Sequence, residues 1–125
     1  LLASKTGADA IIVSNHGGRQ LDGAPSSIKV LPEIVDAVGR KIEIHIDGGI
    51  RSGQDVVKAL CLGAKGTYIG RAFLYGLGAL GKTGVSKSLD IIKNELDKTM
   101  AFCGRRNVED LDKTNLYIEK PLNNY

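Results

Sequence analysis

The stretch Ala10–Gln20 reads AIIVSNHGGRQ, and it decides how the rest of this chain is interpreted. Its first four residues are apolar, which predicts a short buried strand over Ala10–Val13. The residues that follow place His16 and Arg19 three positions apart, in a glycine-rich turn at the mouth of that strand. A histidine can transfer a proton near neutral pH, and an arginine can grip a carboxylate through two hydrogen bonds. The pattern therefore predicts a reaction on a small acid.

Composition places the chain among ordinary globular proteins. Its 125 residues allow at most one domain with a buried core, and a content of 42% hydrophobic and 25% charged residues is typical of such domains. The net charge of +3 is scattered along the chain, which argues against a nucleic-acid-binding patch. No apolar run approaches the roughly 18 residues of a membrane span, so no transmembrane segment or leader is expected.

Cys61 and Cys103 both fall within predicted helices and lack the spacings that bind zinc. We expect both thiols to be reduced and buried, as is usual in a cytosolic protein. The expected location is the cytoplasm, with peripheral association at a membrane as the alternative. No metal ion is expected.

Apolar strands alternate with amphipathic helices along the chain. The predicted strands are 10–13, 42–47 and 66–70, and the predicted helices end at residues 39, 63 and 103. Pro32 fits the first helix only in its first turn. The second helix opens at the capping-box pattern Ser52–Asp55, and the third spans about 86–103. This order predicts a parallel sheet covered by helices on both faces, as part of a larger α/β fold.

Glycine-rich, charged turns follow the second and third predicted strands. They are Asp47-Gly48-Gly49-Ile50-Arg51 and Gly70-Arg71. In parallel α/β folds, ligands bind at the carboxyl ends of the strands. Glycines let backbone N–H groups approach phosphate oxygens, and two arginines neutralise the phosphate charge. Two such turns in succession predict a phosphate site beside His16 and Arg19.

Three motifs in this order, SNHGGRQ at 14–20, DGGIRSG at 47–53 and GR at 70–71, resemble the FMN-dependent 2-hydroxy-acid dehydrogenases and oxidases. The likeness runs to about Leu116 and is closest to the bacterial L-lactate dehydrogenases. It implies the C-terminal portion of a TIM (β/α)8 barrel, with the predicted strands as its sixth, seventh and eighth, in one partial domain over 1–125. It also implies the cofactor FMN and a homo-oligomer, a tetramer in this family.

The resemblance assigns a role to each motif residue. His16 is the base that takes a proton from the substrate, and Arg19 binds the substrate carboxylate beside it. Ser14 contacts the flavin. The residues implied in holding FMN through its phosphate are Asp47, Gly48, Gly49, Ile50, Arg51, Gly70 and Arg71. The implied reaction is FMN-dependent oxidation of an L-2-hydroxy acid, with L-lactate as the favoured substrate, to the 2-keto acid.

The family also implies residues that this sequence does not contain. Its members are much longer, and the lysine near the flavin, the substrate-contacting tyrosines and the aspartate that orients the base are expected upstream of Leu1. We therefore expect the upstream part of the barrel to be a required partner and the 125 residues to be inactive alone, because a base without its orienting carboxylate is weaker. The alternative is a non-catalytic fragment or subunit that keeps the scaffold without turnover.

A remote alternative comes from Gly76–Thr83, whose sequence GLGALGKT matches the P-loop pattern of nucleotide-triphosphate binders. That motif needs a strand immediately before it, whereas Arg71–Tyr75 predicts a helical turn there. The competing interpretation is a flexible glycine-rich link between two helices.

Two further features have structural interpretations. His45 lies between Ile44 and Ile46, which predicts a hydrogen-bonded interior side chain rather than a ligand. Residues 117–125 are interpreted as a polar tail, with docking on a neighbouring subunit left open.

Overall fold

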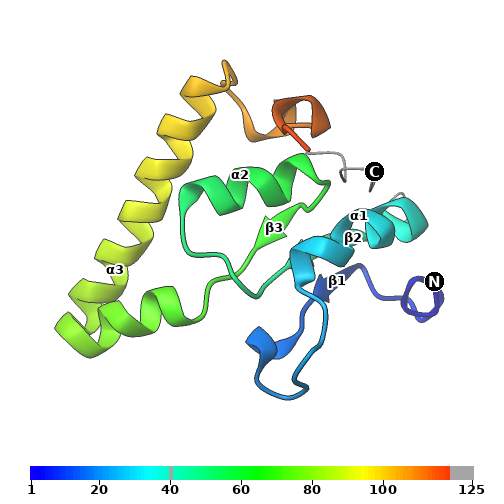
Figure 1. Cartoon of the computed structure of the whole chain (residues 1–125), viewed down its shortest axis with the longest axis horizontal. Coiled ribbons are helices and arrows are strands. Elements are labelled where there is room, and N and C mark those ends of the chain that lie inside the picture. The colour runs from blue at the N-terminus through cyan, green and yellow to red at the C-terminus, as the bar shows by residue number, and fades with distance from the viewer. Residues whose placement is uncertain (40, 119–125) are drawn as a thin grey trace, which may run out of the picture.

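Three short parallel strands form the centre of the fold. The computed structural model describes residues 1–39 and 41–118. The register places Ile11 opposite Ile44 and Val13 opposite Ile46. The predicted parallel α/β arrangement is confirmed, with strands paired in the order β1 (Ala10–Val13), β2 (Glu43–Ile46) and β3 (Gly66–Thr67) (Figure 1).

β2 and β3 are shorter than the sequence predicts. Pairing continues one residue beyond both, since the Asp47 N–H donates to the Val13 carbonyl over 3.1 Å and the Tyr68 N–H donates to the Ile46 carbonyl over 2.9 Å. Gly48 then turns the chain away with a φ of 81°, which favours glycine. Regular strand therefore ends where the polar turns begin.

Helices and 3-10 turns connect the strands. α2 begins with the predicted capping box, in which the Ser52 hydroxyl accepts from the Asp55 N–H over 3.2 Å and the Asp55 carboxylate accepts from the Ser52 N–H over 3.1 Å. α3 packs against α2 (Figure 1). The helical elements are α1 (Ser27–Val38), α2 (Gly53–Cys61), α3 (Arg71–Phe102), η1 (Ala3–Lys5), η2 (His16–Gly18), η3 (Val108–Asp110) and η4 (Lys113–Asn115).

In the described part of the chain, helices cover one face of the sheet, so the predicted cover on both faces is wrong there. The opposite face carries the register partners Ile12 and His45, and Ile12 is 53% exposed. Successive side chains of a strand point to opposite faces, so burying one set leaves the other open. The buried core on the covered face comprises Val13, Leu31, Val38, Ile44, Ile46, Ile50, Val56, Ala59 and Ala64.

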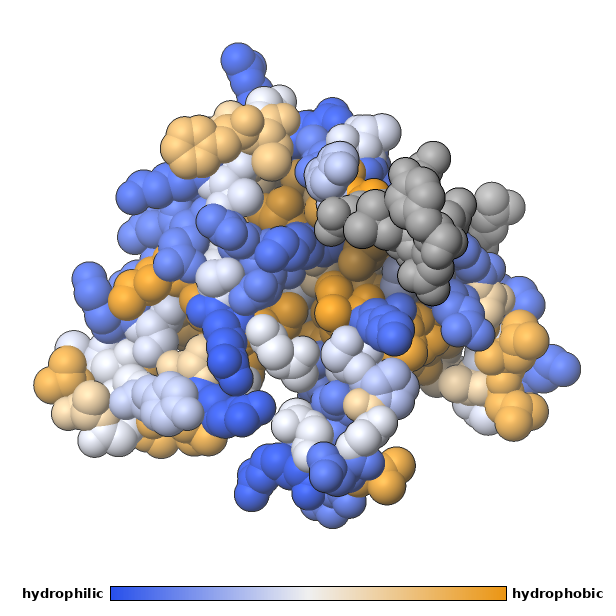
Figure 2. Space-filling model, in the orientation of Figure 1, coloured by the Kyte–Doolittle hydropathy of each residue, from blue (hydrophilic) through white to orange (hydrophobic). Residues whose placement is uncertain are grey.

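Apolar side chains also remain exposed where α3 bends. Figure 2 shows hydrophobic surface at its lower left, around this bend. Leu74, Leu77, Leu80 and Leu89 are all exposed there. Contiguous apolar surface is typical of an interface, which agrees with the expectation of a part of a larger fold.

Pro32 lies deeper in α1 than predicted. The helix begins at Ser27, so Pro32 is its sixth residue and lies beyond the first turn. Its ring removes the N–H that would reach the carbonyl of Ile28. Leu31 and Val38 are buried in the core. Tertiary packing therefore stabilises a helix that local preference would start later.

Residues 71–102 form one helical element with a sharp bend at Leu80 and Gly81, the two residues in it with non-helical dihedral angles. The helix predicted over 86–103 therefore begins earlier, just after the bend. The two arms meet at Gly76 and Gly84, where a Cβ on either residue would collide with the carbonyl oxygen of the other. The predicted glycine-rich link between two helices is confirmed at Leu80 and Gly81, while its flexibility stays a prediction; Gly76 and Gly84 lie in the helical arms and pack them together.

The same geometry contradicts the P-loop alternative. Gly76–Thr83 spans the end of the first arm of α3, its bend and the start of the second arm. A P-loop instead follows a strand directly and cradles phosphate in a loop. β3 ends at Thr67, well before this segment.

His45 is hydrogen-bonded, as predicted. Its Nδ1 lies 3.1 Å from the hydroxyl oxygen of Tyr68, and its Nε2 lies 3.3 Å from Glu43 Oε2. The side chain is half-buried on the open face of the sheet. The two contacts satisfy both ring nitrogens without a ligand.

The predicted tail over 117–125 falls mostly outside the described residues. Tyr117 and Ile118 are exposed, and residues 119–125 lie outside the described part. Within 1–39 and 41–118, no helix is both long enough and apolar enough to cross a membrane.

Cys61 is buried and Cys103 is half-buried, and both are free thiols. The prediction of two buried cysteines therefore holds for Cys61 and is wrong for Cys103, which follows the exposed end of α3. Burial raises the pKa of the Cys61 thiol, and Cys103 and Asp112 raise it further. Less of the Cys61 thiol is thus in the reactive thiolate form near neutral pH.

We predict that Gly84→Ala lowers the free energy of unfolding by about 1–3 kcal/mol, because the added methyl group overpacks the contact with Gly76. Gly78→Ala is the matched control on the same helix. Its Cβ position is open, and alanine there should raise stability by about 0.4–1 kcal/mol. Urea unfolding followed by circular dichroism measures both changes. Equal effects of the two substitutions would contradict the close packing of the arms.

We also predict that iodoacetamide at about pH 8 modifies Cys103 well before Cys61 in the folded chain. The rate at Cys61 should rise through a higher pH range than that of an ordinary thiol, because its pKa is raised. Peptide mass mapping over time gives both rates. In denaturant the two rates should converge, and equal rates in the folded chain would show that Cys61 is not shielded.

Candidate functional site

The loop after β1 coils tightly. The turn η2 places His16 at a φ of 54°, in the left-handed region that few residues other than glycine occupy. The Ser14 hydroxyl oxygen accepts a hydrogen bond from the His16 N–H over 3.1 Å. Strained backbone of this kind concentrates at functional sites. The dihedral angle therefore marks His16 as a candidate.

A cavity of about 290 Å³ opens beside this loop. Ser14, Asn15 and His16 line it, together with Gln20 from the segment that follows. Arg19 is exposed and does not belong to the lining. The structure therefore brings His16 to a cavity and leaves the guanidinium group of Arg19 outside it.

Three buried oxygen atoms behind the loop lack hydrogen-bond partners among the described residues: Asn15 Oδ1, Ser27 Oγ and Asp47 Oδ1. Asn15 Oδ1 and Ser27 Oγ both pack against Gly48, where a Cβ would lie only 3.0 Å from each of these two atoms. Ser27 is only 2% exposed. An unpaired buried polar atom costs about 1–3 kcal/mol, so these oxygens are candidates for hydrogen bonds to a ligand or to water.

Asp47 belongs to the predicted site, whereas Asn15 and Ser27 were missed. Asn15 lies inside the first motif, and its position beside His16 was the available signal. Ser27 offered no signal in the sequence, because only the packing of α1 brings it next to Gly48.

The carboxylate of Asp55 caps the end of the turn 47–51 and the start of α2. The two glycines of the turn have positive φ angles of 81° and 95°. Asp55 Oδ2 accepts hydrogen bonds from the N–H groups of Arg51 and Ser52, both at 3.1 Å. The backbone amide of Arg51 is therefore already paired, and its side chain remains for an anion.

The start of α3 has the opposite character. Among the described residues no side chain caps it at Gly70, so its first N–H groups lie unpaired at the positive end of the helix dipole. Arg51 and Arg71 both line a cavity of about 220 Å³ beside it, here called the cationic cavity. Two guanidinium groups at an open helix N-terminus suit a phosphate monoester. The remaining lining residues are Ala72, Tyr75, Ser88, Ile91 and Ile92.

Arg71 connects the cationic cavity to the His16 loop. Its Nη2 donates a hydrogen bond to the carbonyl oxygen of Gly17 over 3.4 Å. The motifs after β1, β2 and β3 therefore meet at the carboxyl end of the sheet, where the sequence predicted a site.

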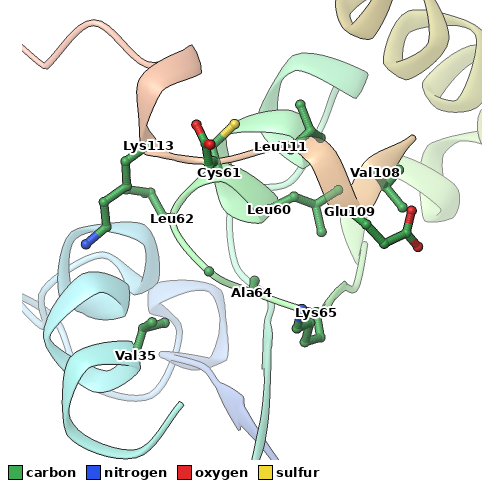
Figure 3. Close-up of a pocket in the computed structure, with 12 residues that line it drawn as sticks. Val35, Leu60, Cys61, Leu62, Ala64, Lys65, Val108, Glu109, Leu111 and Lys113 are labelled. Atoms are coloured by element: carbon green, nitrogen blue, oxygen red, sulfur yellow. The ribbon is translucent and has the colours of Figure 1, made fainter. Parts of the chain in front are cut away.

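A separate groove of about 310 Å³ lies next to the amino end of β3 (Figure 3). Residues of α1, the end of α2, η3 and η4 line it, including Val35, Leu60, Leu111 and Lys113. None of the predicted site residues is among its lining residues. The chemistry of the three motifs thus lies elsewhere, at the opposite end of the strand.

The sequence matches known proteins over nearly its whole length. The family described as "FMN-dependent dehydrogenase" matches residues 1–118. The chain is 54% identical over 120 residues to 2-hydroxyacid oxidase 1 of Mus musculus, which covers 96% of this chain and 32% of that protein. It is 52% identical over 114 residues to an L-lactate dehydrogenase of Caulobacter sp. (strain K31), which covers 91% of this chain and 30% of that protein.

The structure matches as well. A mandelate oxidase variant with a monooxide FMN adduct superposes with a TM-score of 0.83 at 47% identity, over 86% of this chain and 34% of that one. The chain thus spans about a third of the length of the curated relatives it matches. These matches confirm the resemblance that the three motifs carry, and the chain belongs to the family of FMN-dependent dehydrogenases, with 2-hydroxy-acid oxidases and dehydrogenases among its relatives.

Proposed function

We propose that this chain provides the cofactor-phosphate site and the catalytic histidine of an enzyme that uses FMN to oxidise 2-hydroxy acids to 2-keto acids. The cationic cavity carries the proposal. Arg51 and Arg71 lie together at the open N-terminus of α3, one hydrogen bond away from the loop that bears His16. A phosphate-bearing cofactor held there would lie beside a group that can move protons.

The cationic cavity fits the phosphate of FMN. A phosphate monoester carries a charge of about −2 near neutral pH, which the guanidinium groups of Arg51 and Arg71 neutralise. The first amides of α3, after Gly70, supply backbone donors. The turn 48–50 brings further backbone close, because its glycines carry no side chain.

Ser14 and Asp47 fit the rest of the cofactor. The Ser14 oxygen already accepts from the His16 N–H, which leaves the hydroxyl proton for a flavin heteroatom. The buried, unpaired Oδ1 of Asp47 would accept a hydrogen bond from a hydroxyl of the ribityl chain. Such a bond would remove the penalty of an unsatisfied buried oxygen.

His16 is the proposed base. Oxidation of a 2-hydroxy acid removes two electrons and two protons, and FMN supplies the electron sink when bound. The His16 imidazole takes one of the two protons from the substrate, and the second proton and the electron pair would pass to bound FMN. The Arg19 guanidinium is exposed and lies outside the cavity beside His16. We propose that it binds the substrate carboxylate through two parallel hydrogen bonds once the rest of the barrel completes the pocket, and so orients the reacting carbon. Hydrogen bonds to the His16 amide and the Gly17 carbonyl hold the backbone on both sides of the base.

We further propose that the sheet is part of a closed TIM barrel, with β1, β2 and β3 as its sixth, seventh and eighth strands. The open face with Ile12 and His45 supports this, because a barrel packs that face in its interior. The other strands and much of the substrate pocket would come from residues of the barrel other than these 125. L-lactate is the proposed substrate, while a tetramer and a cytoplasmic location remain predictions.

The second candidate is a non-catalytic fragment or subunit of such an enzyme; the chain spans about a third of the length of its curated relatives. Both alternatives share the phosphate site and differ in turnover. A chimera separates them, in which residues 1–118 replace the matching segment of the Caulobacter L-lactate dehydrogenase. The proposed function requires the chimera to bind stoichiometric FMN and oxidise L-lactate, and we expect the chain alone to give no turnover. Bound FMN without oxidation of any 2-hydroxy acid would favour the non-catalytic alternative.

We predict that His16→Gln in the chimera lowers kcat for L-lactate by about 10²–10⁴-fold, because a positioned base contributes this much to proton transfer. FMN content should stay unchanged. His45→Gln is the matched control, since the other histidine of the chain lines neither the cavity beside His16 nor the cationic cavity, and its effect on kcat should be small. Equal losses in the two variants would contradict the role of His16.

We predict that Arg51→Gln and Arg71→Gln each weaken FMN binding about tenfold or more, because each removes a charge-assisted hydrogen bond to phosphate. Riboflavin lacks the phosphate, so its affinity should change little. Arg106→Gln, at an exposed position beyond the end of α3, is the control for loss of charge alone. Fluorescence titration of both flavins gives the affinities, and a parallel loss for riboflavin would exclude a phosphate-specific role.

A further inference from the structure

Glu95 lies outside every sequence motif, yet it contacts the turn that carries Arg51. Its Oε2 accepts a hydrogen bond from the Gly53 N–H over 2.9 Å, across 42 residues of sequence. The bond joins the second arm of α3 to the first residue of α2. It is partly buried, where a bond to a carboxylate is stronger than in water.

Gly53 makes this contact possible. A Cβ at Gly53 would collide with the backbone of Glu95 and Leu96 and would lie 2.7 Å from the Glu95 Cβ. The backbone of α3 therefore lies directly against the start of α2, at a distance that only glycine permits.

Two carboxylates hold three successive amides at this point. Asp55 accepts from the N–H groups of Arg51 and Ser52, and Glu95 accepts from that of Gly53. Asp55 belongs to α2 and moves with it. Of the two, Glu95 is the one that ties the turn to a different element.

That element is α3, which begins at Arg71. Ile92, one helical turn before Glu95, lines the cationic cavity together with Arg51 and Arg71. The contact between Glu95 and Gly53 thus connects the segment that bears Arg51 to the helix that bears Arg71.

We propose that Glu95 is a positioning residue that sets the spacing of Arg51 and Arg71, and thereby the affinity of the chain for the phosphate group of FMN. This inference rests on the proposed function. Glu95 is not among the residues that line the cationic cavity. Its negative charge lies at the positive end of the α2 dipole, so carboxylates occupy one helix N-terminus and the open one at α3 is left for the phosphate.

The test compares FMN with riboflavin, which lacks only the phosphate, in fluorescence titrations of the chimera defined above, because the rest of the barrel is expected to complete the flavin site. Glu95→Ala should lower the ratio of FMN affinity to riboflavin affinity about tenfold, which corresponds to about 1.4 kcal/mol. Glu95→Gln keeps an oxygen acceptor and should retain most of the ratio. Asp97→Ala is the matched control, because it removes the same charge from an exposed position two residues further along α3.

Amide hydrogen exchange of the ligand-free chain provides a second readout. Glu95→Ala should speed exchange at Gly53 and Arg51, while Asp97→Ala should not. If Glu95 had a purely structural role, Glu95→Ala would weaken the binding of FMN and of riboflavin equally. That result, or a ratio of FMN affinity to riboflavin affinity that does not fall in Glu95→Ala, would overturn the proposal for Glu95 alone. A chimera without these substitutions that binds FMN no better than riboflavin would instead overturn the phosphate site, and with it the proposed function and this inference.

Discussion

Parallel pairing of three strands is the constraint on which this molecule depends. The register that sets Val13 opposite Ile46 ends both strands at the same level, so the loop with His16 and the turn with Arg51 leave the sheet side by side. Burial of the apolar face against α1 and α2 holds that register. A slip by one residue would move His45 into the core and the apolar residues of β2 to the open face, which burial strongly disfavours.

The two helices that start at this edge, α2 and α3, carry side chains of opposite charge at their N-termini. The N-terminus of α2 is closed, because Asp55 and Glu95 accept its first amides. The N-terminus of α3 is left open at Gly70, with Arg71 beside it. An anion therefore meets unpaired donors at one helix and carboxylates at the other. The close crossing at Gly76 and Gly84 brings the second arm of α3 back to the cationic cavity. Both arms therefore line this cavity, the first through Arg71 and the second through Ile92.

Features that depend on neighbours in sequence were predictable. The strand Ala10–Val13 and the capping box at Ser52 follow from apolar runs and from hydrogen bonds within a few residues. The position of Pro32 within its helix, the close crossing at Gly76 and Gly84 and the open face of the sheet were not predictable in this way. Pro32 is accepted because the rest of α1 is buried, and the glycine-rich stretch is helical because two arms pack on each other. Local preference is a weak term that such packing overrides.

The sequence by itself determined the family and the alternation of strand and helix, and it indicated the candidate site residues at the strand ends, since each depends on residue type and short spacing. Only the tertiary structure decided which of these residues meet. Arg71 reaches Gly17, Ser27 approaches Asn15 at Gly48, and Glu95 caps α2 through contacts between residues far apart in the chain. The physical reason is that such contacts require backbones to approach within a few ångströms, and packing sets that distance whereas periodicity does not.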